Sequence, residues 1–223
     1  MLIMFNSDVK DLQRIREKLK LIVFDLDGTL TKVRSIWQYI HHKLGVIDKA
    51  LYYKKLYFEK KISYKEWAEL DTSLWKGTPY HVLRKMVESI PLVDDLEETI
   101  NHLKSKYKLA IVTSGLDLIA DKFYKIGFDK LVGNSIEIKD GVVTGKVFVN
   151  VGFHDKIKIL RSFLDEYNLD YEECAVVGDG ENDISMFEKA ALSIAFNPTC
   201  REVEEKSDIV IKGNSLKPLL KIL

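Results

Sequence analysis

Short runs of consecutive apolar residues recur along the chain, and helical patterns lie between them. The runs cover residues 21–24, 109–112, 174–177 and 192–196, with a weaker one at 208–211. Such a run is typical of a strand that is buried on both faces of a parallel sheet. Strands that alternate with helices indicate a doubly wound α/β fold, in which ligands bind at the carboxyl ends of the strands near the switch in strand order.

Several residues mark the ends of the predicted helices. Asp95 and Glu98 predict a capping box at the start of one helix, and Gly127 predicts the end of the next. A third apolar stripe, at residues 157–167, precedes the strand that begins at residue 174. These signals support helices on either side of a parallel sheet.

Residues 136–149 do not follow the strand–helix alternation. Ile136 and Ile138 precede the turn sequence Asp140-Gly141, and apolar residues then alternate with polar ones. An Asp-Gly turn between alternating segments is a strong hairpin signal. We therefore predict a β-hairpin next to the parallel sheet.

Residues 31–91 also interrupt the alternation, and they read as three or four consecutive helices. We interpret this segment as an inserted helical cap. The predicted domains are accordingly a core formed by residues 1–30 and 92–223, and a cap formed by residues 31–91.

Charge is distributed unevenly between these two parts. The chain of 223 residues has 34 basic and 34 acidic side chains and is 46% hydrophobic, which excludes a fibrous or disordered protein. The cap alone has 12 basic and 6 acidic residues and all three Trp, so overall neutrality hides a basic, aromatic-rich insert on an acidic core. Aromatic residues in a small helical bundle usually form its interior, and lysines its solvated faces.

Cysteine and apolar content limit the remaining classes of protein. Cys174 and Cys200 are far apart and match no metal-binding spacing, so a disulfide framework or zinc site is not expected. The apolar start is too short for a signal sequence, and no apolar run reaches about 18 residues. We expect a cytoplasmic protein that does not contact a membrane.

The first strand runs directly into the sequence Asp-Leu-Asp-Gly-Thr at residues 25–29. Because side chains alternate along an extended chain, Asp25 and Asp27 project to the same side at the end of this strand. Two carboxylates this close repel each other unless a cation or a shared proton lies between them. Such a pair also occurs at caps and turns, but its place after an apolar strand favours a ligand site.

A second acidic cluster, Gly-Asp-Gly-Glu-Asn-Asp at residues 178–183, follows another apolar run and opens a helical segment. Its glycines permit a tight turn, and Asp179 and Asp183 supply the hard oxygen ligands that Mg²⁺ prefers. Taken alone, this cluster is also compatible with an Asx-rich turn. Two acidic clusters at the ends of two strands together predict a divalent metal site.

Two further segments can bind an anion. Ser114 and Gly115 follow the run at residues 109–112, where we expect a strand to end and a helix to begin. A hydroxyl and free N–H groups there can hold a phosphoryl oxygen at the positive end of the helix dipole, although a simple helix cap is the alternative. Lys156 lies in the first turn of another predicted helix, the unfavourable end for a cation, so we expect it to face an anion.

The order of these motifs resembles that of the haloacid dehalogenase superfamily of phosphohydrolases. The four motifs correspond to residues 25–29, to Ser114, to Lys156, and to Asp179 with Asp183. The long interval after the first motif corresponds to an inserted helical cap. The sequence GDGENDISMF and the hairpin before Lys156 are similar to those of the phosphoserine phosphatase-like branch. The resemblance implies a Rossmann-like parallel core with a cap.

Catalytic roles follow from the resemblance alone. Asp25 would be the nucleophile that forms an aspartyl-phosphate, and Asp27 would act first as general acid and then as general base. Ser114 and Lys156 would hold the transferring phosphoryl group. The implied enzyme is a Mg²⁺-dependent phosphatase that acts on a small phosphorylated substrate.

The resemblance also implies the residues that bind the metal and the substrate. Gly115 and Asn182 would contact the substrate beside Ser114 and Lys156. The expected Mg²⁺ ligands are the Asp25 carboxylate, the Asp27 backbone carbonyl, Asp179 and, directly or through water, Asp183.

The cap departs from the pattern of phosphoserine phosphatases. In that branch a glutamate nine residues after the nucleophile meets the substrate's ammonium group, and an arginine in a later cap helix meets its carboxylate. This chain has Arg34 at the first position, and an approximate alignment places Asp71 at the second. We therefore hypothesise that Arg34 binds a substrate other than phosphoserine, one with further negative charge or an aromatic group; a surface role for Arg34 is the alternative.

Two other functions stay open from the sequence alone. The basic, aromatic cap is compatible with a phosphatase that acts on nucleotides or nucleic-acid ends, through phosphate contacts and base stacking. A nucleic-acid partner is nevertheless not favoured, because the positive charge is modest and no recognised motif accompanies it. The other open function is a non-catalytic interaction module. The intact acidic cluster argues against it, because such a module has no need for like charges that are costly to bring together.

Overall fold

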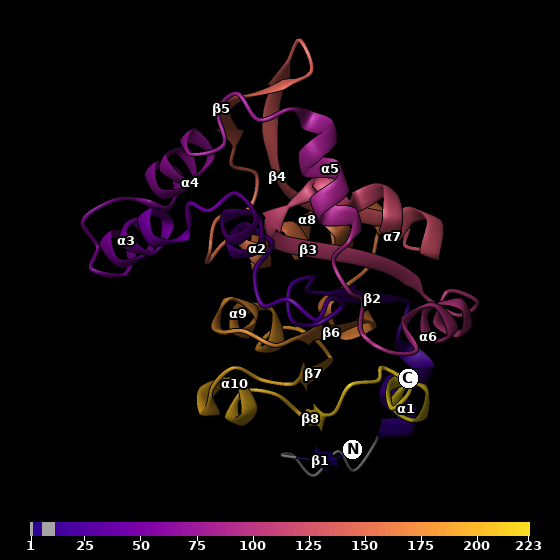
Figure 1. Ribbon diagram of the computed structural model, residues 1–223. Coiled ribbons are helices and arrows are strands. Elements are labelled where there is room, and N and C mark those ends of the chain that lie inside the picture. Colours follow the sequence, from indigo (N-terminus) through magenta and orange to yellow (C-terminus); the bar gives the residue numbers. More distant parts are fainter. Residues whose placement is uncertain (1, 6–11) are drawn as a thin grey trace.

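A mixed β-sheet forms the centre of the molecule (Figure 1). The computed structural model describes residues 2–5 and 12–223. Within them the strand order is β1-β8-β7-β6-β2-β3-β4-β5. The two edge strands are antiparallel to their neighbours, β1 to β8 and β5 to β4, and all other neighbouring strands are parallel. The strands are β1 Leu2–Phe5, β2 Leu21–Phe24, β3 Lys108–Leu116, β4 Lys130–Lys139, β5 Val142–Phe148, β6 Cys174–Gly178, β7 Leu192–Phe196 and β8 Ile209–Lys212. The predicted doubly wound α/β sheet is confirmed.

The chain reverses its direction across the sheet at β2. From β2 the chain moves to β3 and β4 on one side, and it later returns to β6, on the other side of β2, before continuing to β7 and β8. The carboxyl end of β2 is therefore the switch point at which doubly wound sheets bind their ligands. The first acidic motif begins at this end.

Helices cover both faces of the sheet. Ile22 and Phe24 of β2 pack into one apolar cluster with α6 and α7, whereas Leu21 and Val23 pack into a second cluster with α8, α9 and α10. This division follows from the alternation of side chains along a strand. Outside the cap the helices are α1 Leu12–Lys18, α6 Leu96–Leu103, α7 Ala120–Ile126, α8 Lys156–Tyr167, α9 Ile184–Phe187, α10 Arg201–Glu205 and α11 Leu219–Ile222.

Four helices form in the cap, as the sequence predicts: α2 Ile36–Lys43, α3 Ile47–Phe58, α4 Tyr64–Ser73 and α5 Tyr80–Glu88. Figure 1 shows α3 and α4 on the left, beyond the carboxyl end of β2. Aromatic rings pack inside this insert. The ring centroid of the fully buried Trp75 lies 5.2 Å from that of Trp37, and the Tyr57 ring stacks on Trp67 with 4.9 Å between their centroids. Because α2 and α5 also join the apolar cluster of the sheet, the division into core and cap domains stays a prediction.

The predicted hairpin is confirmed, and it supports the cap. Asp140 and Gly141 both have positive φ, which is the geometry of a tight hairpin turn between β4 and β5. The N–H groups of Gly77 and Tyr80 donate to carbonyls of the hairpin, each at 2.8 Å, and Val143 donates back to Thr78 at 2.9 Å. The segment between α4 and α5 is thereby anchored to the core.

Two local predictions are wrong. Asp95 adopts a left-handed conformation and makes no capping hydrogen bond; its carboxylate instead accepts from Ser215 at 2.6 Å, so a tertiary contact replaces the expected capping box. Ser114 and Gly115 do not begin a helix, because β3 continues to Leu116 and a 3₁₀ turn precedes α7. The helix dipole therefore plays no part at Ser114.

Among the described residues, the longest helices, α3 and α8, have 12 residues each, and none combines the length and apolarity required to cross a bilayer.

Candidate active site

The carboxyl end of β2 brings two aspartates to the centre of the sheet. The Asp25 N–H donates to the Val177 carbonyl at 2.8 Å, which continues the pairing between β2 and β6. Asp25 is only 4% exposed. Burial is the main cause that raises the pKa of Asp25 to about 6, while Lys156 opposes the rise and Asp183 adds to it.

The loop after β6 is folded around Asp183. One carboxylate oxygen, Oδ2, accepts hydrogen bonds from the N–H groups of Asp179 and Gly180, both at 3.0 Å. A Cβ atom on Gly178 would lie 2.4 Å from the Asp183 carboxylate, so glycine is required for this close approach. The loop thus presents Asp179 toward Asp25.

Lys156 joins the two acidic motifs. Its Nζ lies 2.5 Å from Asp25 Oδ1 and 2.6 Å from Asp183 Oδ1, and the side chain is fully buried. Burial alone would lower the pKa of Lys156, but Asp183 and Asp25 raise it above the ordinary value, so the ammonium stays charged. The expectation that Lys156 faces anions is confirmed for these carboxylates.

One oxygen each from Asp25, Asp179 and Asp183 lies within 4.8 Å of the others, and all three residues are buried. The Lys156 ammonium and the Arg34 guanidinium, which ion-pairs with Asp179, together carry less charge than three carboxylates. Burial and the charges of Asp25 and Asp183 raise the pKa of Asp179 to about 8, against the opposing effect of Arg34. Hard oxygen ligands with excess negative charge fit a divalent cation. This cluster is the candidate metal site.

Asp27 differs from Asp25 in its hydrogen bonds. Its Oδ2 accepts from the Ile36 N–H at 3.0 Å, at the start of α2, whereas Oδ1 is buried without a hydrogen-bond partner among the described residues. Burial is the main cause that raises the pKa of Asp27 to about 7. A carboxyl group with this pKa can both donate and accept a proton near neutral pH.

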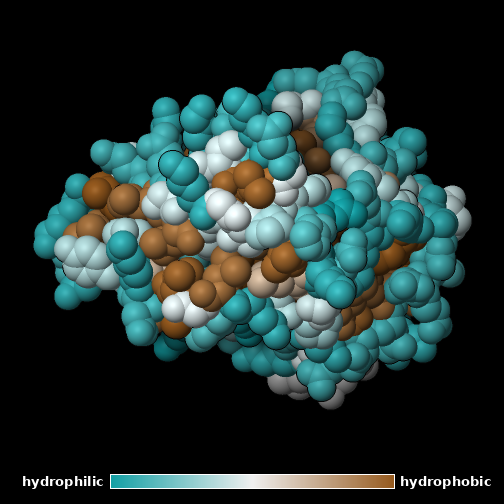
Figure 2. Space-filling model, turned by 45° about the horizontal axis from the view of Figure 1, so that its top comes forward, coloured by the Kyte–Doolittle hydropathy of each residue, from teal (hydrophilic) through white to brown (hydrophobic). Residues whose placement is uncertain are grey.

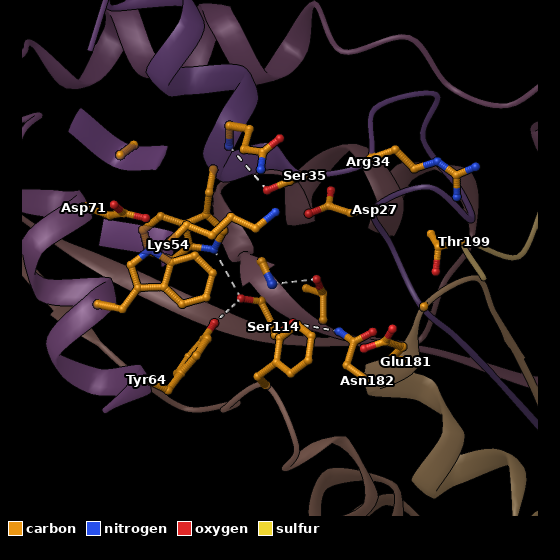
Figure 3. A pocket seen from close by; sticks show the side chains of 18 of the residues that line it. Asp27, Arg34, Ser35, Lys54, Tyr64, Asp71, Ser114, Glu181, Asn182 and Thr199 are labelled. Atoms are coloured by element: carbon orange, nitrogen blue, oxygen red, sulfur yellow. Dashed lines mark hydrogen bonds between the residues drawn. The ribbon is translucent and has the colours of Figure 1, made fainter. Parts of the chain in front are cut away.

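Ser114 is held from several sides (Figure 3). Its hydroxyl accepts a hydrogen bond from Asn182 Nδ2 at 3.0 Å. Its carbonyl accepts from the Trp37 indole N–H at 3.2 Å, from the Tyr64 hydroxyl at 2.7 Å and from Asn134 Nδ2 at 2.9 Å. Since Trp37 and Tyr64 belong to the cap, cap and core meet at the residue predicted to bind phosphate.

Gly115 lies between Ser114 and Asp27. Its N–H donates to Thr113 Oγ1 at 2.8 Å and is therefore not free, contrary to the expectation for a helix start. An added Cβ would lie 2.8 Å from Asp27 Oδ2, so the absence of a side chain makes room for Asp27.

A cavity of about 500 Å³ opens above these groups and extends under the cap. Its wall contains six of the predicted substrate or catalytic residues, Asp25, Asp27, Arg34, Ser114, Gly115 and Asn182, together with Asp179. Arg34 Nη1 ion-pairs with Asp179 and donates to the Asn197 carbonyl at 3.0 Å, and its side chain is half exposed. Lys156 and Asp183 do not line the cavity. Lys156 ion-pairs with Asp25 in the cavity wall and with Asp183 behind it.

The cap supplies the rest of the cavity wall. In Figure 2 hydrophobic side chains gather on the left of the face, where Figure 1 places α3. Leu51 and Phe58 of α3 are about half exposed and line the cavity. The cavity is thus acidic at its base and largely apolar on the cap side.

The family model for haloacid dehalogenase-like hydrolases matches residues 19–191. The chain belongs to the haloacid dehalogenase-like hydrolases. Phosphoserine phosphatase from Methanocaldococcus jannaschii is 35% identical, with 94% of this chain and 100% of that protein covered. The phosphoserine phosphatase of Archaeoglobus fulgidus is 32% identical over 93% of this chain and 60% of that protein.

Solved structures give the same relationship. A phospho-aspartyl intermediate analogue of phosphoserine phosphatase aligns with a TM-score of 0.79 at 34% identity, covering 92% of this chain and 99% of that one. A substrate-bound phosphoserine phosphatase complex aligns with a TM-score of 0.80 at 33% identity and the same coverage. Among haloacid dehalogenase-like hydrolases, this chain is therefore phosphoserine phosphatase-like.

Several residues of this hydrolase's site were not found from its sequence. Asn134 is fully buried and binds the Ser114 and Val151 carbonyls, but nothing in its sequence neighbourhood distinguishes it from a polar residue in a strand. Trp37 and Tyr64 lie in amphipathic helices, where an aromatic residue ordinarily contributes to the hydrophobic core. Their role depends on how the cap meets the core.

A divalent cation should stabilise this hydrolase. At a concentration one hundred times its Kd, a bound ion adds about 2.7 kcal/mol, which for a chain of this size raises Tm by roughly 5–11 °C. Thermal unfolding with and without Mg²⁺ measures this shift, and Asp179→Asn should reduce it strongly. An unchanged wild-type Tm would contradict the candidate metal site.

The same cluster predicts how stability depends on pH without a cation. The pKa values of Asp25, Asp27 and Asp179 are raised in the folded protein, whereas Asp titrates near 3.9 in an unfolded chain. The folded state binds these protons more tightly, so stability is lost as pH rises from about 4 toward about 8. In a chelator, Tm should fall from about pH 5 to about pH 8, and saturating Mg²⁺ should flatten this slope. A Tm that rises over this range in the chelator would contradict the assignment.

Proposed function

We propose that this protein is a Mg²⁺-dependent phosphomonoester hydrolase that acts through an aspartyl-phosphate on a small phosphorylated metabolite. The observation that carries the proposal is the convergence of the buried Asp25, Asp179 and Asp183 carboxylates and the Lys156 ammonium at the base of a cavity. A phosphate dianion approaches aspartates only where cations cancel their charge. The names of the relatives support this reading, because they are phosphoserine phosphatases and one structure is a phospho-aspartyl analogue.

Asp25 is the nucleophile in this mechanism. Lys156 holds Oδ1, so we assign the attack on phosphorus to Oδ2. The Asp25–phosphorus bond forms as the bond from phosphorus to the ester oxygen breaks, and Asp27 gives its proton to the departing oxygen. Asp27 then removes a proton from the water that hydrolyses the aspartyl-phosphate, which releases phosphate and restores Asp25.

Ser114 and its neighbours position the phosphoryl group. The Ser114 hydroxyl lies at the cavity wall with Asn182 Nδ2 3.0 Å away, and both can donate to phosphoryl oxygens. Three donors on the Ser114 carbonyl hold the peptide in place, so little reorganisation is needed during the reaction.

Mg²⁺ is the cation we assign to the acidic cluster. Asp25, Asp179 and the Asp27 backbone carbonyl would hold it, and Asp183 would contribute through water, because Lys156 and two backbone N–H groups already occupy its carboxylate. When bound, Mg²⁺ would offset the negative charge of the cluster and polarise a phosphoryl oxygen.

Substrate preference should differ from that of the relatives. Arg34 lines the cavity near Asp179, and Asp71 lines it on the cap side. These charges are opposite to those expected for a phosphoserine site, so we assign a substrate with additional negative charge or an aromatic group. The Arg34 guanidinium, half exposed, is available to such a group once a cation occupies Asp179.

The other functions receive less support. A non-catalytic module would not require buried carboxylates with raised pKa values around a fully buried lysine. For a nucleic-acid-end phosphatase, the three Trp of the cap would serve as stacking surfaces, but Trp75 is buried and Trp37 and Trp67 pack on neighbouring rings. The cytoplasmic location stays a prediction.

Replacement of the nucleophile tests the mechanism. Asp25→Asn should lower kcat for p-nitrophenyl phosphate by roughly 10⁴-fold or more, because an amide does not attack phosphorus. Near-UV circular dichroism should be unchanged. Asp165→Asn, on the exposed side of α8, is the matched control and should keep wild-type activity. Substantial turnover by Asp25→Asn would rule out the covalent route.

Arg34 gives a test of substrate preference. Wild-type kcat/KM for O-phospho-L-serine should not exceed that for 3-phosphoglycerate or p-nitrophenyl phosphate. Arg34→Gln should lower kcat/KM for 3-phosphoglycerate about tenfold relative to p-nitrophenyl phosphate, as expected for loss of a charge-assisted hydrogen bond. A strong wild-type preference for phosphoserine would contradict the proposed substrate class.

A further inference from the structure

Lys54 is a charged residue in an otherwise apolar stripe of the cap. The face of α3 that lines the cavity consists of Ile47, Ala50, Leu51, Lys54 and Phe58. These positions share one side of the helix, because residues three and four apart are neighbours on a helix surface. Lys54 lies in the middle of this stripe and is half-buried. Packing alone would favour an apolar residue at this position, so the charge indicates a role toward the cavity.

The Lys54 ammonium is not neutralised by its surroundings. Among the described residues, no ion pair involves Lys54, whereas its neighbours Lys55 and Lys61 both pair with Glu59, at 3.7 and 2.7 Å. Lys54 Nζ lies 5.8 Å from the centroid of the Phe58 ring, one turn further along α3. A cation–π contact of this kind leaves the three N–H donors of the ammonium available to a ligand.

The other basic side chains that line the cavity, among the described residues, face acidic partners. The Arg34 guanidinium pairs with Asp179, and His41 Nε2 lies 3.3 Å from Asp71 Oδ2. Figure 3 shows the Lys54 side chain reaching into the pocket with its amine directed away from Asp71. An anionic ligand can therefore reach Lys54 without displacing a carboxylate.

The geometry of phosphoryl transfer directs the leaving group toward the cap. Asp25, the proposed nucleophile, lies at the base of the cavity, and α3 lines the opposite side. Because the attacking and leaving oxygens lie roughly in line with phosphorus, the leaving group points away from Asp25. A negative substituent on it would meet the Lys54 ammonium beside Leu51 and Phe58, where charge attraction is screened less than in bulk water.

We infer that Lys54 determines specificity by binding an anionic group, a carboxylate or a second phosphate, on the leaving group of the substrate. This inference rests on the proposed phosphatase function and names a further residue that recognises the additional negative charge of its substrate. Recognition by Lys54 adds to that by Arg34, which lies in the loop before α2. An ammonium with three donors forms charge-assisted hydrogen bonds with either anion.

A series of phosphate monoesters tests the inference in the wild-type enzyme. The alkyl leaving groups have two to six carbons, and each length ends in a methyl, a carboxylate or a phosphonate group. The phosphonate represents a second phosphate that the enzyme cannot hydrolyse. At the length that reaches Lys54, kcat/KM for an anion-ended ester should exceed that for the methyl-ended ester about tenfold or more, as expected for one charge-assisted hydrogen bond.

The variant Lys54→Gln removes the charge and keeps a polar side chain. The ratio of kcat/KM for the preferred anion-ended ester to kcat/KM for the methyl-ended ester of the same length should fall about tenfold, and Lys54→Arg should retain most of the wild-type ratio. Lys55→Gln is the matched control, because it removes the same charge from the next residue of α3, whose side chain is exposed and pairs with Glu59. This control should keep the wild-type ratio. Thermal unfolding of the three variants reports on the fold of the cap.

Four results would overturn the inference, and they are distinguishable. Equal wild-type kcat/KM for all three ends at every length, or turnover of p-nitrophenyl phosphate alone, would show that the cavity does not recognise an anion, while the phosphatase function would stand. An anion preference that persists in Lys54→Gln would assign the recognition to another residue. An equal loss in Lys54→Gln and Lys55→Gln would show that only the overall charge of the cap matters. Absence of wild-type turnover on these esters and on p-nitrophenyl phosphate would remove the proposed function and the inference together.

Discussion

Repulsion among buried carboxylates is the constraint on which the rest of this active site depends. Asp25, Asp179 and Asp183 approach within 4.8 Å because two strand ends meet at the switch point of the sheet. Lys156 and Arg34 compensate part of their charge, and Lys156 also fixes Asp25, but an excess of negative charge remains. In the proposed reaction the site is therefore incomplete without a further cation, and a phosphate ester could approach only once that cation offsets the remaining negative charge.

The cap is coupled to this chemistry through a few hydrogen bonds. The first turn of α2 donates to Asp27, and Trp37 and Tyr64 donate to the Ser114 carbonyl. A displacement of the cap would thus remove hydrogen-bond partners at once from Asp27, the proposed acid–base residue, and from Ser114, the proposed phosphate-binding residue. In the proposed reaction, substrate selection by the cap and reactivity at the core are linked through these contacts, and the leaving group would lie between the two parts.

Much of the fold and of the acidic site could be predicted because the signals are local. Each motif directly follows an apolar strand, and parallel strands end at one edge of the sheet, so Asp25 and Asp179 had to be close. The capping box at Asp95 failed because a contact with Ser215, distant in sequence, replaced it. The prediction that a helix begins at Ser114 is wrong because β3 continues beyond the apolar run to Leu116. The contact of Asn134 with the Ser114 carbonyl depends on long-range packing that no sequence spacing reveals.

The account is tested most directly by locating a metal ion in crystals. Crystals grown with Mn²⁺, measured at the manganese absorption edge, should show one anomalous peak within coordination distance of both Asp25 and Asp179, with Lys156 still bound to Asp25. A map without a peak at this position, or with Asp25 and Asp179 too far apart to share an ion, would contradict the central claim.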